Sequence, residues 1–169
     1  MELSNKIQLA IRDVHDFPKD GIVFKDITPI MMDAGLSNEI LEALAEQFRS
    51  ENLQGIAGIE SRGFLFGFPL AMALGIPFIM IRKKGKLPYE KISHAYDLEY
   101  GSAVIEMHSD ALSPGDRILI HDDLLATGGS AAAAAELIQK CQGVVAGFNL
   151  EGREKLKTYS ENISNLVQY

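Results

Sequence analysis

The chain has 169 residues and a formal net charge of −7 at pH 7, and its length and apolar content predict one domain with a sizeable core. This acidic balance argues against nucleic acid as a partner, because no basic face is large enough to neutralise many phosphates. No apolar run approaches the length of a membrane span, the N-terminus lacks a signal-peptide pattern, and the single cysteine, Cys141, suits a reducing cytoplasm.

The N-terminal segment contains three expected elements. Apolar residues from Leu3 to Val14 recur at helical spacing, which predicts a helix that ends near Asp16. The run 22–29 is too short for a helix before its proline, and its β-branched and aromatic residues leave an extended loop and an edge strand as alternatives. Ser37 and Glu39 then predict the start of a structural helix with one apolar face.

Two successive strands each end in a polar glycine-containing loop. Residues 55–59 predict a short strand that ends in Glu60-Ser61-Arg62-Gly63, and an apolar helix over 64–74 follows, with Pro69 inside it. Such a loop at the end of a parallel strand is a typical ligand site. Arg62 has a bidentate guanidinium that suits a diphosphate, and a surface ion pair with Glu60 is the alternative.

The second of these strands leads into a basic run. Residues 78–81 predict a fully buried strand, and Arg82, Lys83, Lys84 and Lys86 surround Gly85 at its end. This run is a candidate anion site, with a solvated surface as the alternative. Residues 92–108 then alternate between apolar and polar about Gly101, which predicts an antiparallel hairpin outside the parallel core.

The most informative stretch runs from Arg117 to Ser130. An apolar run ends in Asp122-Asp123, and a Gly-Gly turn leads into an alanine-rich helix, so the pattern predicts a buried strand, a tight loop and a helix N-terminus. The unpaired amides of that helix N-terminus and the hydroxyls of Thr127 and Ser130 can surround a phosphate. The two carboxylates would repel this phosphate, so we expect them to face ribose hydroxyls. The stretch therefore predicts a ribose 5-phosphate cradle.

This stretch also resembles the phosphoribosyl pyrophosphate (PRPP) signature of type I phosphoribosyltransferases. Leu124-Leu125-Ala126-Thr127 is similar to the version in adenine phosphoribosyltransferases, and so are the runs 17–27, 60–63, 82–88 and 96–101. The resemblance covers nearly the whole chain. It implies an α/β fold with a Rossmann-like parallel sheet core over about 36–150, a small N-terminal hood over about 1–35, and a flexible catalytic hairpin over about 88–108.

The resemblance also implies site residues. In the hood, the backbone of Val23 and Lys25 reads adenine and Phe24 packs on its face. Arg62, Glu99, Asp122 and Asp123 are the expected catalytic residues, with Glu99 exchanging a proton with the purine and Tyr100 shielding the site. The expected binding residues at the diphosphate are Glu60, Ser61, Arg62, Arg82, Lys83 and Lys86. Those at the ribose hydroxyls are Asp122 and Asp123, and those at the 5-phosphate are Leu125, Ala126, Thr127, Gly128, Gly129 and Ser130.

The implied activity is purine salvage, in which adenine and PRPP give AMP and pyrophosphate through an oxocarbenium-like transition state. Magnesium is expected to arrive bound to PRPP, without dedicated protein ligands, and the implied assembly is a cytoplasmic homodimer. His121, Lys25, Tyr89 and a shortened segment after Leu150 depart from the family pattern. A transferase for an oxopurine, a PRPP-sensing regulator and a sugar-phosphate binding module without catalysis are the alternative functions.

Overall fold

The computed structural model describes residues 1–98, 101–122, 129–149 and 163–164. Within these residues a seven-stranded sheet has the order β5-β6-β4-β3-β7-β8-β9, and β1 and β2 form a separate two-stranded sheet. The bounds are α1 Leu3–Ala10, β1 Arg12–His15, β2 Val23–Asp26, α2 Thr28–Met32, α3 Ala34–Phe48, β3 Gly55–Ile59, α4 Gly63–Leu74, β4 Phe78–Lys83, β5 Lys91–Asp97, β6 Ser102–His108, β7 Arg117–His121, α5 Gly129–Lys140, β8 Val144–Asn149 and β9 Ile163–Ser164.

The core of the large sheet is parallel, as predicted. Strand β3 pairs in parallel with both β4 and β7, and β8 continues the parallel order beside β7. All five residues of β3 are buried, which is typical of a parallel strand covered on both faces. Helix α5 packs its small alanines on one face against Ala57 and Ile120, while α3 and α4 cover the other face at Ile56 and Leu119.

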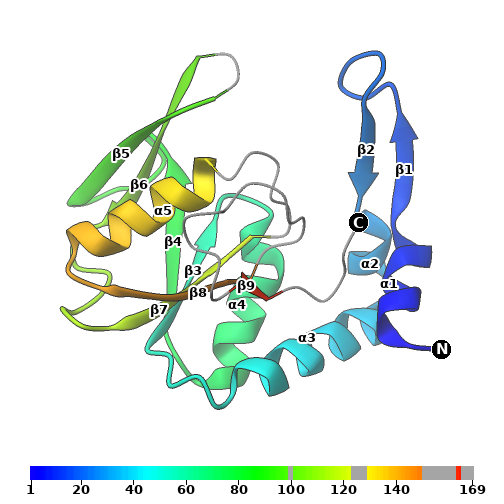
Figure 1. Cartoon of the computed structure of the whole chain (residues 1–169), viewed down its shortest axis with the longest axis horizontal. Helices are drawn as coiled ribbons and strands as arrows, with labels where there is room; N and C mark the ends of the chain where they lie inside the picture. Colours follow the sequence, from blue (N-terminus) through cyan, green and yellow to red (C-terminus); the bar gives the residue numbers. More distant parts are fainter. Residues whose placement is uncertain (99–100, 123–128, 150–162, 165–169) are drawn as a thin grey trace.

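The predicted hairpin is present, and it joins the large sheet. Strands β5 and β6 pair antiparallel, with Asp97 opposite Ser102. Strand β6 then pairs antiparallel with β4, placing Arg82 opposite Glu106. The hairpin therefore extends the core sheet beside β4, as Figure 1 shows on the left of the molecule.

The N-terminal hood stands apart from the sheet, and α3 leads from one to the other (Figure 1). The prediction of a helix to Asp16 was wrong, because α1 ends at Ala10 and residues 12–15 form β1. Pairing with β2, in which Val14 lies opposite Phe24, overrides the local helical spacing. The same pairing shows that residues 23–26 of the run 22–29 form a strand, β2, rather than a loop. The five-residue helix α2 begins at Thr28 and has Pro29 in its first turn.

The structure also corrects or refines the predictions for α3, α4 and β4. Helix α3 begins at Ala34, not at Ser37, because the Asp33 side chain accepts a hydrogen bond from the Leu36 amide and caps the helix. Helix α4 runs through Pro69 and ends at Gly75, which has φ +68°. Strand β4 is not fully buried, since Met80 is 42% exposed on the face that it shares with Phe78.

Candidate active site

Two predicted ligand loops and the end of β7 meet at one edge of the sheet. Parallel strands end at the same edge, so the register that pairs Ile59 with Ile81 and Gly58 with His121 brings together residues 60–63, the basic run and Asp122. We call residues 60–63 the pyrophosphate loop and residues 82–86 the basic loop. Gly129 and Ser130 begin α5 at the same edge, directly after β7 and its loop.

The pyrophosphate loop lies against the end of β7. A Cβ added to Gly63 would come 2.5 Å from the His121 carbonyl oxygen and 3.3 Å from the Asp122 Cα, so only glycine permits this approach. The peptide bond between Glu60 and Ser61 is cis. The close approach of Gly63 places the N-terminus of α4 beside Asp122, the first of the two predicted ribose carboxylates. Arg62 directly precedes this helix.

Glu60 connects the pyrophosphate loop to the basic loop. Its side chain is only 8% exposed, and its carboxylate accepts hydrogen bonds from the Lys83 amide at 2.9 Å, from Arg82 Nε at 3.3 Å and from Lys86 Nζ at 2.5 Å. Burial alone would raise the pKa of Glu60, but these three donors outweigh it and lower the pKa to about 2. The carboxylate of Glu60 thus pairs with Arg82 and Lys86 of the basic loop, which does not favour the alternative of a surface ion pair with Arg62.

The hood reaches the pyrophosphate loop through an aromatic contact. The Arg62 guanidinium carbon lies 5.7 Å from the centre of the Phe24 ring, within the range of a cation–π interaction. Phe24 also packs edge-on against Phe17, with 5.3 Å between ring centres. The residue predicted to pack on adenine and the residue predicted to bind the diphosphate are thus neighbours.

The other two hood residues have different surroundings. Val23 is 46% exposed. The ammonium group of Lys25 forms an ion pair with Asp13 at 2.6 Å, and the contact of its backbone with adenine stays a prediction. Asp26 accepts a hydrogen bond from the Thr28 amide, and bonds from the Thr28 side chain and backbone lower the pKa of the Asp26 carboxyl.

His121 is buried directly beneath the site. It is 4% exposed, and a Cβ on Gly67 would lie 3.1 Å from its Cδ2 atom. Within the described parts of the chain, neither ring nitrogen has a hydrogen-bond partner, and neither has the side-chain amide nitrogen of the neighbouring Asn149. Burial lowers the pKa of His121 to about 4, although the Asn149 backbone opposes the shift. The side chain is therefore a neutral packing group at neutral pH.

Several predicted site residues lie outside the residues that the structure describes: Glu99, Tyr100, Asp123, Leu125, Ala126, Thr127 and Gly128. The shortened segment directly after Leu150 does so as well. Their roles remain predictions. Within the described ranges, Ser61, Arg62, Arg82, Lys83, Lys86 and Asp122 share the carboxyl edge, and Phe24 meets them from the hood.

One residue at this edge was missed from the sequence. Glu106 of β6 is 3% exposed and accepts a hydrogen bond from the Gly85 amide at 2.9 Å. Its place between Ile105 and Met107 in an alternating strand indicated a solvent-facing side chain. Glu106 is placed at this edge by the antiparallel pairing of β6 with β4, in which it lies opposite Arg82. Sequence periodicity does not give such pairing, so it could not have identified this residue.

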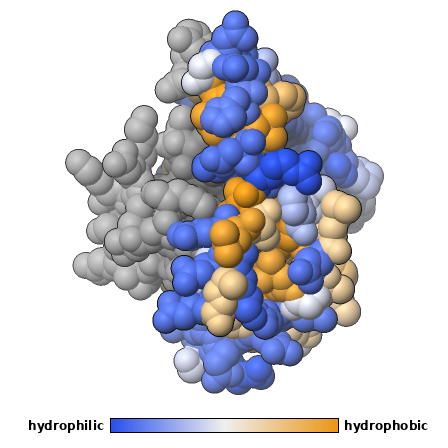
Figure 2. Space-filling view, turned by 90° about the vertical axis from the view of Figure 1, so that its right-hand side faces the viewer, coloured by the Kyte–Doolittle hydropathy of each residue, from blue (hydrophilic) through white to orange (hydrophobic). Residues whose placement is uncertain are grey.

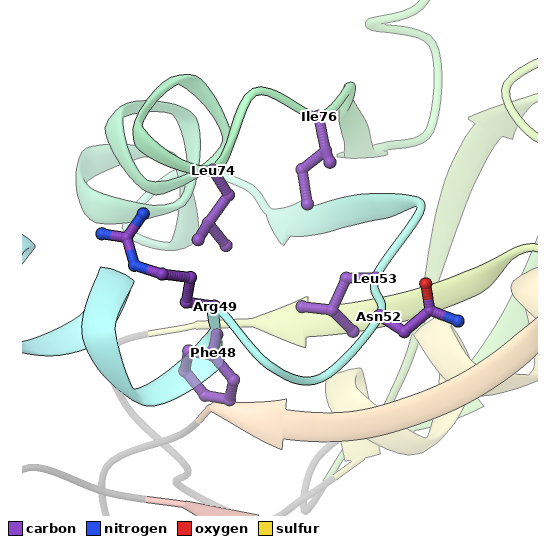
Figure 3. A pocket seen from close by; sticks show the side chains of 6 residues that line it. All are labelled: Phe48, Arg49, Asn52, Leu53, Leu74 and Ile76. Carbon is purple, nitrogen blue, oxygen red and sulfur yellow. The ribbon is translucent and has the colours of Figure 1, made fainter.

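A pocket of about 240 Å³ lies at the opposite edge (Figure 3). Asn52 and Leu53 precede β3 and Ile76 precedes β4, so the pocket is at the amino ends of these strands and away from the predicted ligand loops.

Among the described residues, none of the helices is long and apolar enough to span a bilayer. The same residues contain no group of three His, Cys, Asp or Glu side chains placed to hold a metal ion.

Known proteins share this architecture and sequence. A model of the phosphoribosyl transferase domain matches residues 33–148. The adenine phosphoribosyltransferase of Cytophaga hutchinsonii is 47% identical, over 99% of this chain and 96% of the relative. The crystal structure of the Thermoanaerobacter pseudethanolicus enzyme is 43% identical with a TM-score of 0.92, covering 99% of this chain and 100% of that one.

A third relative was solved with ligands. The Saccharomyces cerevisiae adenine phosphoribosyltransferase, complexed with adenine and an imino-altritol bisphosphate, is 37% identical with a TM-score of 0.86, over 97% of this chain and 98% of that one. These matches extend over the hood, the sheet and the carboxyl-edge loops. The chain therefore belongs to the adenine phosphoribosyltransferases, within the type I phosphoribosyltransferase family.

Proposed function

We propose that this protein transfers the 5-phosphoribosyl group of PRPP to N9 of adenine, forming AMP and releasing pyrophosphate in purine salvage. The contact between Arg62 and Phe24 carries this proposal. It joins a loop with the chemistry of a diphosphate site to an aromatic side chain suited to a purine face. Chains 37–47% identical to this one carry the name of this activity.

The proposed chemistry depends on positioning and charge. Departure of pyrophosphate would develop positive charge on the ribose, and Asp122 and Asp123 would hold the ribose hydroxyls and favour that charge. Residues 125–130 would bind the 5-phosphate at the N-terminus of α5. Glu99 would exchange a proton with the purine, a role worth about 10²- to 10⁴-fold in rate. Tyr100 and the hairpin would shield the reacting carbon from water.

Magnesium fits this arrangement as a companion of PRPP. It prefers hard oxygen ligands, retains water readily and is usually held by one or two carboxylates together with substrate phosphates. PRPP oxygens would therefore supply most ligands, with Asp122 and Asp123 near the ribose hydroxyls. When bound, the ion neutralises charge on the leaving pyrophosphate.

We also infer a homodimer in the cytoplasm. Leu65, Phe68 and Met72 of α4 are 42%, 52% and 67% exposed, and Met80 of β4 is 42% exposed. Together these apolar side chains offer a surface for a second copy of the chain. Apolar residues also gather on the face that the hood and the N-terminal helices present (Figure 2). Light scattering coupled to gel filtration would measure the mass, and a monomer at micromolar concentration would refute the dimer.

The first experiment is product formation from PRPP and magnesium with adenine, hypoxanthine, guanine or no base. We expect AMP from adenine and no nucleotide from the oxopurines, because an oxopurine reverses the donor and acceptor at position 6. Nucleotide from hypoxanthine or guanine alone would assign an oxopurine transferase. PRPP binding without any nucleotide product would assign a regulator or a binding module instead.

The same assay tests the role of Glu99. Glu99→Gln removes the acidic group, so we expect turnover to fall by about 10²-fold while the KM for adenine changes little. A lower affinity for adenine at unchanged turnover would reassign Glu99 to binding.

A further inference from the structure

Two buried acids hold the basic loop from both sides. Glu60 extends from the end of β3 with 8% of its side chain exposed, and Glu106 of β6 is 3% exposed. Buried carboxylates are rare unless hydrogen-bond donors or cations compensate them. Here the compensating donors all come from residues 82–86, so the acids and this loop form one unit.

Glu60 uses both carboxylate oxygens in that unit. One oxygen accepts from the Lys83 amide at 2.9 Å and from Arg82 Nε at 3.3 Å, and the other accepts from Lys86 Nζ at 2.5 Å. Bonds from charged donors to a buried carboxylate are among the stronger ones in proteins. The Glu60 side chain is therefore committed to the protein and is not available as a ligand for an anionic substrate.

Hydrogen bonds to backbone groups fix the rest of the loop. Glu106 accepts from the Gly85 amide at 2.9 Å, where Gly85 has φ +82° and suits glycine. The Lys84 amide donates to the Val104 carbonyl at 3.0 Å, and Arg82 Nη1 donates to the Lys86 carbonyl at 3.3 Å. The loop thus has a defined shape before any ligand binds.

This arrangement divides the cations of the loop into two pairs. Arg82 and Lys86 are engaged by Glu60. Lys83 and Lys84 are exposed, and no ion pair within the described parts of the chain involves their ammonium groups. The bond from the Lys83 amide to Glu60 fixes the backbone from which one of these exposed side chains extends.

We propose that Glu60 is a positioning residue that locks the basic loop to the pyrophosphate loop, and so sets the affinity for the diphosphate without touching it. This inference rests on the proposed function, because it assumes that a diphosphate binds at this edge. The pyrophosphate loop follows Glu60 directly in the chain, so the carboxylate ties the two anion-binding loops at a fixed spacing. A preformed pair of loops avoids the entropy cost of ordering them around the ligand.

The test measures binding of inorganic pyrophosphate, with magnesium present, by titration calorimetry. Glu60→Gln keeps the size of the side chain but removes its charge and replaces one acceptor oxygen with an NH₂ group, which then faces either Lys86 Nζ or the Lys83 amide and Arg82 Nε. We expect pyrophosphate to bind about tenfold more weakly, with adenine affinity unchanged. The matched control is Glu39→Gln, which breaks an exposed ion pair with Lys6 at 2.6 Å and should leave both affinities within twofold. Pyrophosphate affinity that is unchanged or higher in Glu60→Gln would overturn the proposal.

A double-mutant cycle separates positioning from direct contact. If Glu60 and Lys86 act as one unit, Lys86→Met and Glu60→Gln should each weaken pyrophosphate binding about tenfold, and the double variant should be no more than about twofold worse than either. An additive hundredfold loss would mean that Lys86 binds pyrophosphate independently, which overturns the lock. Glu60→Asp retains the negative charge on a shorter side chain. Because this variant can still form the buried ion pair, we expect a loss of pyrophosphate affinity between those of the unsubstituted protein and Glu60→Gln.

The two proposals fail in different ways. If the unsubstituted protein binds pyrophosphate but forms no AMP, the proposed function fails while the lock is still measurable by calorimetry. If the unsubstituted protein forms AMP and Glu60→Gln has the same KM for PRPP, only the lock fails. We expect Glu60→Gln to raise the KM for PRPP about tenfold with a much smaller change in kcat, because the lost interactions prepare binding.

Discussion

The carboxyl edge of the sheet and the N-terminal hood contribute to the same site but are built differently. At the sheet edge, buried Glu60 and close backbone contact at Gly63 fix the loops. In the hood, two short strands are joined by the pair Lys25–Asp13, whose side chains are 40% and 45% exposed. Exposed ion pairs contribute about 0–1 kcal/mol, whereas breaking a buried one is strongly destabilising.

The difference separates stability from base recognition. The sheet edge would bind charged groups that every phosphoribosyl transfer shares, and its basic loop is held by the buried carboxylates of Glu60 and Glu106. The hood would read the base, and it can change with little effect on the core because few of its side chains are buried. Substitutions at the edge should therefore lower stability and catalysis together, and substitutions in the hood should act mainly on adenine.

The largest effect is expected for Gly63→Ala at the sheet edge. The new methyl group would meet the His121 carbonyl oxygen at 2.5 Å, so α4 must move away from β7 and carry Arg62 from Asp122. We expect AMP formation to fall by more than about 100-fold and the free energy of unfolding to fall by about 1–3 kcal/mol. Steady-state kinetics and urea denaturation measure the two changes.

The control for this substitution is Gly35→Ala in α3. There the methyl group meets only the Asp33 side chain, at 3.3 Å, and alanine favours the helix. Stability should change by less than about 1 kcal/mol, with activity retained. Normal activity in Gly63→Ala would show that the spacing between α4 and β7 does not limit catalysis.

In the hood, Phe24→Leu should separate recognition from stability. The ring that packs beside Arg62 is lost, so we expect the KM for adenine to rise about tenfold while the KM for PRPP and the unfolding midpoint change little. Phe17→Leu removes the same edge-on ring pair but leaves Phe24 in place. It should change the KM for adenine by less than about threefold. Equal effects of both variants would assign Phe24 to hood structure rather than to the base.

His121 gives the sheet edge a dependence on pH in the mildly acidic range. Its folded pKa of about 4 lies below the unfolded value of 6.5, so the unfolded chain binds the proton more readily and stability falls as pH drops from about 6.5 toward about 4. At pH 5 this loss is about 2 kcal/mol. His121→Val should remove that part of the slope in urea denaturation at pH 5 and pH 7.5. The same slope in the variant would assign it to other groups.

The smallest effect is expected for Asp13→Asn, which breaks the exposed pair with Lys25. The free energy of unfolding should change by less than about 1 kcal/mol, and the KM for adenine should stay within twofold, because the backbone of residues 23–25 would read the base. Thermal unfolding and adenine titration test this. A tenfold rise in the KM would show that the ion pair orders the hood.

Much of the core could be predicted from the sequence. Strands 55–59 and 117–121 and the hairpin of β5 and β6 follow from apolar runs and alternation, because these patterns record which side chains a strand buries. Glycines and hydroxyl residues after strands indicated the anion loops, since backbone amides at helix N-termini favour phosphates. The family resemblance then identified the activity, and the comparisons confirm that membership.

Other features were decided only by tertiary structure. Residues 12–15 have helical spacing but pair with residues 23–26, Glu60 meets donors 22 to 26 positions away, and Glu106 is buried against the basic loop. Each depends on a partner remote in sequence. Local periodicity gives the face of an element but not its neighbour. The sequence by itself therefore determined most elements of the sheet core and the family, whereas long-range pairing determined the hood strands and which charges are locked together.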